Sequence, residues 1–223
     1  MKILAVADVP HPALYAHFDA KRWQGIDLLL ACGDLKWDYL DFLATSLGVP
    51  LIYVKGNHDP DTRSGFSAVG EDINGRVVRY KGVRIAGFEG SAWYGGRGLE
   101  YTETEMRLLV WRTIPRLLIS GGADIVISHA PPVLKREEAP AVEFSESVVD
   151  VVLSQPRTYT PEDDGPTDHA HRGFYAYNRL IQFFHPRLWL HGHTHLNYSR
   201  APRLRRLHGT LVANAFGYFV FEI

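Results

Sequence analysis

Six polar side chains in this sequence are of the types that hold divalent metal ions in hydrolytic enzymes. Such sites combine carboxylate, amide and neutral imidazole ligands and leave positions open for water and substrate. A single Asp after a strand is more often a turn or a helix cap. The set carries weight because its members follow five separate apolar runs. The six residues are Asp8, Asp34, Asn57, His129, His193 and His195.

The apolar runs before these residues have the composition of buried strands. Because the carboxyl ends of neighbouring parallel strands meet at one edge of a sheet, we expect the polar residues that follow them to converge there. The predicted strands are Ile3–Ala7, Asp27–Ala31, Pro50–Val54, Ile125–Ser128 and Leu188–Leu190.

Segments with helical periodicity separate the predicted strands. In one of them Thr102 and Glu105 have the spacing of a capping box, so a helix is expected to begin there. Pro115 lacks a backbone N–H and is expected to kink or end the same helix early. In the last helix an apolar stripe that includes Tyr177 and Ile181 is assigned to the core. The predicted helices cover residues 12–24, 37–47, 102–119 and 172–184.

Further strands complete the predicted architecture. Val77–Tyr80 and Arg84–Phe88 are expected to form a hairpin, and Arg203–His208 and Thr210–Ile223 to add antiparallel strands. Strands that alternate with helices, with antiparallel additions, predict an α/β sandwich of layers. Residues 135–170 contain several prolines and no strong periodicity, which indicates a long loop insertion. That insertion is either a solvated surface loop or a lid over the site.

Length and composition are those of an ordinary globular protein. The chain has 223 residues, 46% of them hydrophobic, and we expect one domain over residues 1–223. Its 24 basic and 25 acidic residues give a net charge of −1, which offers no electrostatic reason for nucleic acid or an anionic membrane as an obligate partner. The lone Cys32 excludes an intramolecular disulfide. No apolar run suits a membrane span or a signal peptide, so a cytoplasmic location is expected.

Four blocks of sequence resemble, in order and spacing, the motifs of the calcineurin-like metallophosphoesterase family. The Gly-Asn-His-Asp block followed by a Gly-His-Thr-His block is a specific signal, and the match spans almost the whole chain. The resemblance implies a four-layer sandwich of two mixed β-sheets flanked by helices, with two divalent metal ions at the strand ends. The blocks are Gly33–Asp34, Gly56–Asp59, Ser128–Pro132 and Gly192–His195.

By the family pattern, Asp34 would bridge the two metal ions, since two neighbouring cations need an anion between them. His58 would lie beside the scissile phosphate as general acid or charge stabiliser, and Asp59 would orient its imidazole. The alternative is that His58 and Asp59 have only a structural role and cap the N-terminus of a helix. Nitrogen and oxygen ligands together suit Mn, Fe, Zn, Ni or Co. The other ligands would be Asn57, His129 and His193 at one ion, and Asp8 and His195 at the other.

The chain departs from the family at its first motif. The usual Asp-x-His is replaced here by Asp8, Val9, Pro10 and His11, and Pro10 cannot ligate a metal. In a strand, His11 would point to the opposite face, but a loop shaped by Pro10 could turn it back as a replacement ligand. Three outcomes are open: a site completed by His11 or water, an enzyme with one metal ion, or a scaffold without hydrolysis.

Two further clusters are candidates for substrate binding. His171 and Arg172 precede the last predicted helix, whose N-terminus would favour a phosphate; alternatively they are solvated residues beside a helix cap. The glycine-rich segment Ser91–Gly98 places Arg97 close to two aromatic residues, which could stack on a nucleobase or an aryl leaving group. The alternative is an ordinary glycine loop whose aromatic rings cover the core.

Together these features predict a metal-dependent phosphoesterase that acts on small phosphodiesters or phosphomonoesters. The alternative is a catalytically weak or silent scaffold that binds a protein partner, and Pro10 is the residue that motivates it. A nuclease of long nucleic acids is disfavoured by the near-neutral charge and the lack of a basic stripe.

Overall fold

The computed structural model describes residues 1–60, 70–96, 98–135, 140–142, 171–197 and 201–223. Most of the predicted insertion over 135–170 lies outside these ranges. The division into one domain with an insertion therefore stays a prediction.

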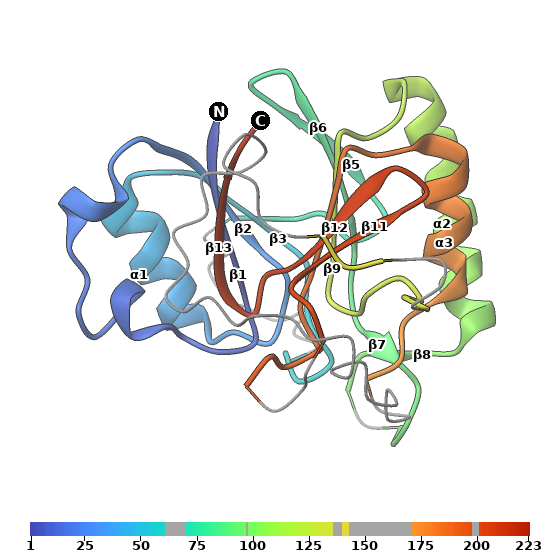
Figure 1. Ribbon diagram of the computed structural model, residues 1–223, viewed down its shortest axis with the longest axis horizontal. Coiled ribbons are helices and arrows are strands. Elements are labelled where there is room, and N and C mark those ends of the chain that lie inside the picture. The colour runs from blue at the N-terminus through green and yellow to red at the C-terminus, as the bar shows by residue number, and fades with distance from the viewer. Residues whose placement is uncertain (61–69, 97, 136–139, 143–170, 198–200) are drawn as a thin grey trace.

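Two mixed β-sheets pack against each other, and helices lie on both outer sides (Figure 1). The first sheet consists, in order, of β13 (Gly217–Glu222), β1 (Lys2–Ala7), β2 (Ile26–Ala31), β3 (Leu51–Tyr53) and β4 (Glu71–Asp72). The second consists, in order, of β11 (Leu204–Leu207), β12 (Thr210–Asn214), β10 (Leu188–His191), β9 (Ile125–Ser128), β6 (Val83–Phe88) and β5 (Val77–Tyr80). A small pair joins β7 (Ser91–Ala92) to β8 (Glu100–Tyr101).

The centre of each sheet is parallel and its edges are mostly antiparallel. β1, β2 and β3 run parallel in the first sheet, as do β6, β9, β10 and β12 in the second. All five predicted strands are present, and the predicted hairpin is formed by β5 and β6. This arrangement sends the carboxyl ends of the central strands to common edges, where the predicted ligands follow them.

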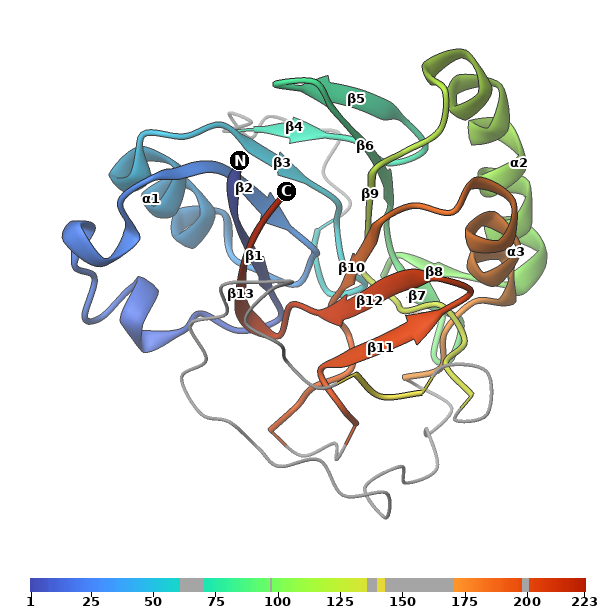
Figure 2. The same cartoon turned by 45° about the horizontal axis from the view of Figure 1, so that its top comes forward.

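The predicted antiparallel strands at the end of the chain are present, and the segment over 210–223 divides into two strands that lie in different sheets. Residues 210–214 pair with β11 and β10 in the second sheet, whereas residues 217–222 pair antiparallel with β1 in the first. The chain turns between them because the Asn214 side chain accepts the N–H of Phe216 at 2.8 Å and Gly217 adopts a φ of 72°. The C-terminal segment thus connects the two sheets (Figure 2).

The helices depart from prediction at three places. Residues 12–24 form two 3₁₀ helices, Pro12–Leu14 and Ala20–Trp23, because Asp19 caps a second turn by accepting the N–H of Lys21. α3 (Tyr175–Phe184) begins three residues later than predicted. α1 (Trp37–Leu47) forms as predicted.

α2 (Glu103–Ser120) begins with the predicted capping box but does not end early at Pro115. Because Pro115 has no N–H, the carbonyl of Trp111 has no helical hydrogen-bond partner. Both residues lie on the exposed face of the helix. Water can therefore reach that carbonyl, and the helix continues for another turn.

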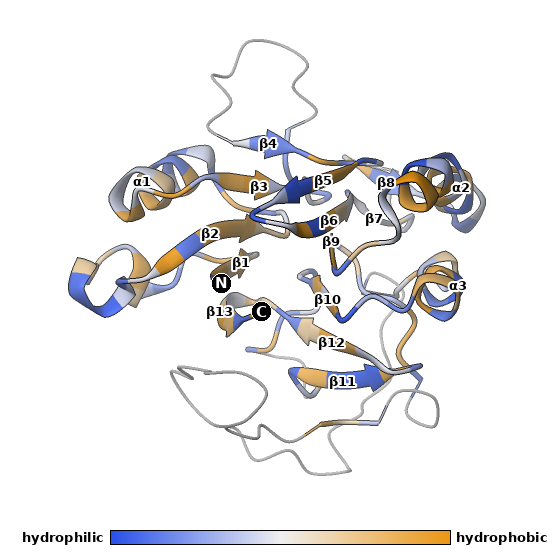
Figure 3. Ribbon diagram, turned by 90° about the horizontal axis from the view of Figure 1, so that it is seen from above, coloured by the Kyte–Doolittle hydropathy of each residue, from blue (hydrophilic) through white to orange (hydrophobic). Residues whose placement is uncertain are grey.

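Three apolar clusters hold the layers together. One fills the space between the sheets and includes Ile3, Leu30 and Ile127. Another packs the second sheet against α2 and α3 around Tyr177, as the apolar stripe predicted, and a third packs the first sheet against α1. In the view from above, β1, β2 and β3 of the first sheet are coloured mostly as apolar (Figure 3). The predicted four-layer architecture is confirmed.

None of the helices within the described ranges has both the length and the apolar character needed to cross a membrane.

Candidate metal centre

Residues that follow the central strands of both sheets meet at one place. Asp8 follows β1, and its backbone N–H donates to the carbonyl of Gly33 after β2 at 3.1 Å. Across the sandwich, the Oδ1 atom of Asp8 accepts the backbone N–H of His193, which follows β10, at 2.8 Å. The strand ends of the two sheets are therefore joined at Asp8.

Several residues at this junction have strained backbones. Asp8, Asp34 and His193 have φ values of 65°, 57° and 64°, in the left-handed region that residues with side chains rarely adopt. Such conformations persist only where the surrounding structure enforces them, and they concentrate at functional sites.

Asp8, Asp34 and His129 form a group that can hold a metal ion. One ligand atom from each lies within 4.8 Å of the others, and Nε2 of His129 is 3.3 Å from Oδ2 of Asp34. The Oδ2 atom of Asp8 is buried and has no hydrogen-bond partner among the described residues. A buried carboxylate oxygen without a partner is costly, and a cation would satisfy it. These donors fit a divalent metal ion.

The ring of His129 is oriented as a metal ligand requires. Its Nδ1 lies 2.8 Å from the carbonyl of Cys32, which can only accept, so Nδ1 carries the proton. Its Nε2 faces Asp34 and also lies 2.9 Å from Oδ1 of Asn57. The other end of the Asn57 amide, Nδ2, donates to the hydroxyl of Tyr94 at 3.1 Å. Asn57 therefore turns its oxygen toward the metal centre.

The charges at the centre shift one another's pKa values. Burial raises the pKa of Asp8 to about 6. Burial would also raise the pKa of Asp34, but the His129 ring and the N–H of His58 lower it to about 2. Burial would lower the pKa of His129, but the Asp34 carboxylate outweighs it and raises that pKa to about 9. Two carboxylates buried here require a nearby positive charge.

We expect the metal-free protein to lose stability as the pH rises from about 4 to about 6. Folding raises the pKa of Asp8 from 3.8 to about 6, so the folded state binds this proton more tightly than the unfolded state. The free energy of unfolding then falls across this interval, by up to about 3 kcal/mol from Asp8 alone. Urea unfolding in the presence of a chelator measures it. Asp8→Asn should remove most of this dependence of the free energy of unfolding on pH. An unchanged pH dependence in that variant would show that Asp8 is not its cause.

Asp59 joins two loops of the centre. Its Oδ2 atom accepts the backbone N–H groups of Asp34 and Gly56, each at 2.8 Å. The sequence predicted instead that Asp59 orients the imidazole of His58. No hydrogen bond between these two side chains is present in the described part of the chain, and the contacts of Asp59 favour a role in holding the loops. His58 itself is exposed, and its N–H donates to Oδ1 of Asp34 at 2.8 Å.

Two glycines allow these loops to approach each other. Gly33 has a φ of 90°, and a Cβ atom there would lie 2.7 Å from Nδ1 of His129. A Cβ atom at Gly56 would collide with the carboxylate of Asp34. The glycines of the two motifs are therefore needed for close contact between the strand ends.

The remaining predicted histidines also gather at this centre. Nε2 of His195 lies 3.7 Å from Oδ1 of Asp8, and the rings of His129 and His193 have centroids 4.9 Å apart. The ring of His171 lies 5.1 Å from that of His193 and 5.9 Å from that of His195. The structure thus brings His171 into the cluster.

His11 lies in a different environment from a metal ligand. Its Nδ1 accepts the N–H of Ala13 at 3.2 Å and so caps the first 3₁₀ helix, while its ring packs edge-on against Tyr218, with centroids 4.6 Å apart. Burial and the positive charges of Arg22 and Arg203 lower its pKa. These contacts favour a structural role, contrary to the possibility that His11 replaces the missing ligand. Pro10 itself is exposed.

We expect His11→Ala to leave the metal content per chain unchanged. The substitution removes a helix cap and a ring contact, so the free energy of unfolding should fall by roughly 0.5–2 kcal/mol. Elemental analysis combined with denaturant unfolding separates the two effects. A loss of one metal ion per chain would restore His11 as a ligand.

Of the two arginines predicted to bind substrate, Arg172 and Arg97, the structure describes only Arg172. Nη2 of Arg172 donates to the carbonyl of Trp93 at 3.3 Å. Arg172 therefore lies at the rim of the centre, beside the loop after β7 that carries Trp93 and Tyr94. Arg97 lies outside the described residues. Sequence reasoning proposed only stacking for Tyr94 and missed its contact with Asn57, because no spacing in the sequence signals a hydrogen bond between these two loops.

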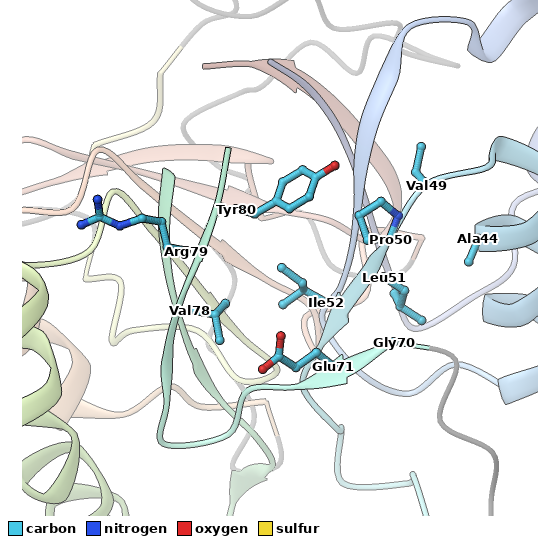
Figure 4. A pocket seen from close by; sticks show the side chains of 10 residues that line it. All are labelled: Ala44, Val49, Pro50, Leu51, Ile52, Gly70, Glu71, Val78, Arg79 and Tyr80. Carbon is cyan, nitrogen blue, oxygen red and sulfur yellow. The ribbon is translucent and has the colours of Figure 1, made fainter. Parts of the chain in front are cut away.

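A separate pocket of about 320 Å³ lies at the start of β3 (Figure 4). Its lining is mostly apolar and includes Leu51 and Val78, with Glu71 and Arg79 also present. Because the metal centre lies beyond the other end of β3, this pocket is not part of it.

The comparisons with known proteins agree with this fold and donor set. The chain belongs to the calcineurin-like phosphoesterase family, whose sequence model matches residues 1–197. The predicted family is therefore confirmed. Among curated proteins no match was found.

Several solved structures share the fold. One crystal structure superposes with a TM-score of 0.62 and 15% identity, covering 98% of this chain and 93% of its own. The protein TT1561 of Thermus thermophilus superposes with a TM-score of 0.58 and 14% identity, covering 96% and 88%. A Vps29 single mutant from Entamoeba histolytica has a TM-score of 0.39 and 14% identity, covering 96% and 73%. At these identities the first two likenesses show the fold alone.

Proposed function

We propose that this chain is a metal-dependent hydrolase of small phosphodiesters or phosphomonoesters. The observation that carries the proposal is the buried group of Asp8, Asp34 and His129, with one oxygen of Asp8 lacking a partner among the described residues. Family membership supports the same reaction class. Small phosphate esters are the proposed partners, with neither a membrane nor an obligate nucleic acid, and the predicted cytoplasmic location stays a prediction.

The donor set divides into two proposed metal positions with Asp34 between them. Bound divalent cations, of Mn, Fe, Zn, Ni or Co, would supply a water of lowered pKa and polarise the phosphate oxygens. Asp34 lies close to both groups of ligands, because its Oδ2 is 3.3 Å from Nε2 of His129 and a ligand atom of Asp34 lies within 4.8 Å of one of Asp8. The proposed ligands are Asp8 and His195 on one side, and Asn57, His129 and His193 on the other.

His58 is the proposed source of the proton for the leaving group. Its side chain is exposed, so a substrate can reach it, and its backbone is fixed by the Asp34 carboxylate. A positioned imidazole can donate a proton to the departing oxygen or stabilise the charge that develops there. His171 and Arg172 at the rim are proposed to bind the non-bridging oxygens of the phosphate.

The second candidate function is a scaffold that binds a protein partner without hydrolysis. The observation that favours it is that the position of an expected imidazole ligand holds the exposed Pro10, while His11 caps a helix elsewhere. The acidic pair Asp8 and Asp34 beside His129 favours the enzyme, because a scaffold has no use for a buried acidic pair with an unpartnered oxygen.

Metal content and turnover together test the proposal. The protein is purified without chelator, its metal content per chain is measured, and hydrolysis of bis-para-nitrophenyl phosphate is followed with added Mn²⁺. About two metal ions with turnover support two sites despite Pro10. One metal ion with turnover indicates a mononuclear enzyme. Neither metal nor turnover under any supplement would favour the scaffold.

A further inference from the structure

The loop after β7 borders the metal centre and presents two aromatic side chains. Tyr94 is 40% exposed although its hydroxyl accepts a hydrogen bond from Nδ2 of Asn57. Its neighbour Trp93 is 54% exposed. The phenol ring of Tyr94 therefore lies directly against a proposed metal ligand while much of its surface is open.

This aromatic loop is held in place by the protein itself. A single carboxylate oxygen, Oε2 of Glu100, accepts the backbone N–H groups of Tyr94, Gly95 and Gly96 at 3.0, 3.0 and 2.9 Å. A Cβ atom at Gly98 would collide with the carbonyl of Asn57, so the loop also lies close against that residue. Rings held in this way lose little conformational freedom when a ligand binds.

Arg172 meets the same loop from the side of the histidine cluster. Its guanidinium donates to the carbonyl of Trp93, and the adjacent His171 contacts the rings of His193 and His195. The adjacent Gly173 lets this segment lie against the chain after β9, because a Cβ atom there would lie 2.5 Å from the carbonyl of Pro131. The rim of the metal centre thus combines a cationic fork, which suits a phosphate, with two aromatic rings.

We propose that Trp93 and Tyr94 form a subsite for a planar aromatic group esterified to the substrate phosphate. The site then prefers nucleotide-like or aryl phosphoesters over alkyl phosphoesters. The inference rests on the proposed function, because it names the substrate class of that site. Stacking of a base on an aromatic side chain strengthens binding by roughly tenfold, and the π-face of any planar ring can take part.

Equilibrium binding tests the subsite without any need for turnover. Thymidine 5′-monophosphate, phenyl phosphate and methyl phosphate are titrated into the Mn²⁺-loaded protein, and the absence of released inorganic phosphate confirms that each ester is intact when its affinity is measured. We expect thymidine 5′-monophosphate to bind roughly tenfold more tightly than methyl phosphate, and Trp93→Ala to reduce this ratio to about threefold or less. Phenyl phosphate shows whether a simple aryl ring suffices or a nucleobase is needed. Equal affinities for the aromatic and alkyl ligands in the unaltered protein would overturn the proposal.

The chain offers a matched control for this substitution. Trp111 is 68% exposed on the outer face of α2, and Trp111→Ala should leave the affinity ratio as it is. Tyr94→Phe keeps the ring but removes the hydroxyl that holds the Asn57 amide. It should keep the preference for aromatic ligands while weakening metal binding by about 10- to 100-fold. If Trp93→Ala and Trp111→Ala preserve the ratio equally, Trp93 is not part of the subsite.

Turnover separates this proposal from the proposed function. Thymidine 5′-methyl phosphate and dimethyl phosphate both release methanol, and only the first of them carries a planar ring. Roughly tenfold higher kcat/KM for the thymidine ester, arising mainly in KM, supports the subsite. Hydrolysis of both esters at equal kcat/KM would overturn the subsite and support the hydrolase. A binding preference with no hydrolysis of either ester would support the subsite and contradict the hydrolase.

Discussion

His58→Ala is expected to lower kcat by roughly two to four powers of ten while the metal content per chain stays the same. The imidazole is exposed at the rim of the centre, where it can reach a leaving oxygen. Residue 58 contacts Asp34 through its backbone N–H, which donates to the Asp34 carboxylate, and alanine keeps that N–H. Steady-state kinetics and elemental analysis measure the two quantities on the same sample.

The choice of leaving group shows what His58 does. A general acid matters most when the departing alcohol is strongly basic, so the loss should be larger for an alkyl leaving group than for para-nitrophenol. A charge stabiliser would give similar losses for both. His17, which is also exposed, provides the control, and His17→Ala should leave kcat unchanged. Unchanged turnover in His58→Ala would remove His58 from the mechanism.

Asp34→Asn is expected to abolish most metal binding and to lower kcat/KM by roughly a thousandfold or more. The amide has the shape of the carboxylate but lacks the negative charge that two neighbouring cations require. Asp34 lies close to both His129 and Asp8, which is why it is the proposed bridge between the two metal positions. Metal titration and kinetics at saturating Mn²⁺ measure the loss.

A measurement on the metal-free protein checks the same residue independently. The Asp34 carboxylate is what raises the pKa of His129 to about 9, against the effect of burial. In Asp34→Asn the pKa of His129 should therefore fall from about 9, although the Asp8 carboxylate and the Cys32 carbonyl still raise it, and an NMR titration detects the fall. Asp41→Asn, an exposed substitution on α1, is the control for loss of one charge. Full metal binding by Asp34→Asn would show that Asp34 is not a ligand.

The sequence alone predicted the central strands and most of the proposed ligands. Asp8, Asp34 and His129 could be recognised because each follows a continuous apolar run, and runs of that kind form parallel strands whose ends meet. That inference uses only local pattern and the geometry of a sheet. The Thr102 capping box is equally local, because both partners lie within one helical turn.

Local pattern failed where a competing interaction comes from another part of the chain. α3 starts at Tyr175 rather than at residue 172 because Glu103, at the start of α2, accepts the N–H groups of Tyr175 and Ala176. Residues 210–223 supply predicted antiparallel strands, but the sequence pattern did not indicate that they divide between two sheets at the turn held by Asn214. Neither outcome follows from periodicity, since the periodicity is the same on either side of the turn.

The sequence by itself determined which residue types are available at the metal centre, and the tertiary structure decided which of them meet there. His11 and His171 were both candidates, and packing places His11 against Tyr218 but His171 beside His193. Tyr94 meets Asn57 across 37 residues. The physical reason is that strand ends are positioned by backbone hydrogen bonds common to all sheets, whereas loop side chains are positioned by contacts specific to this packing.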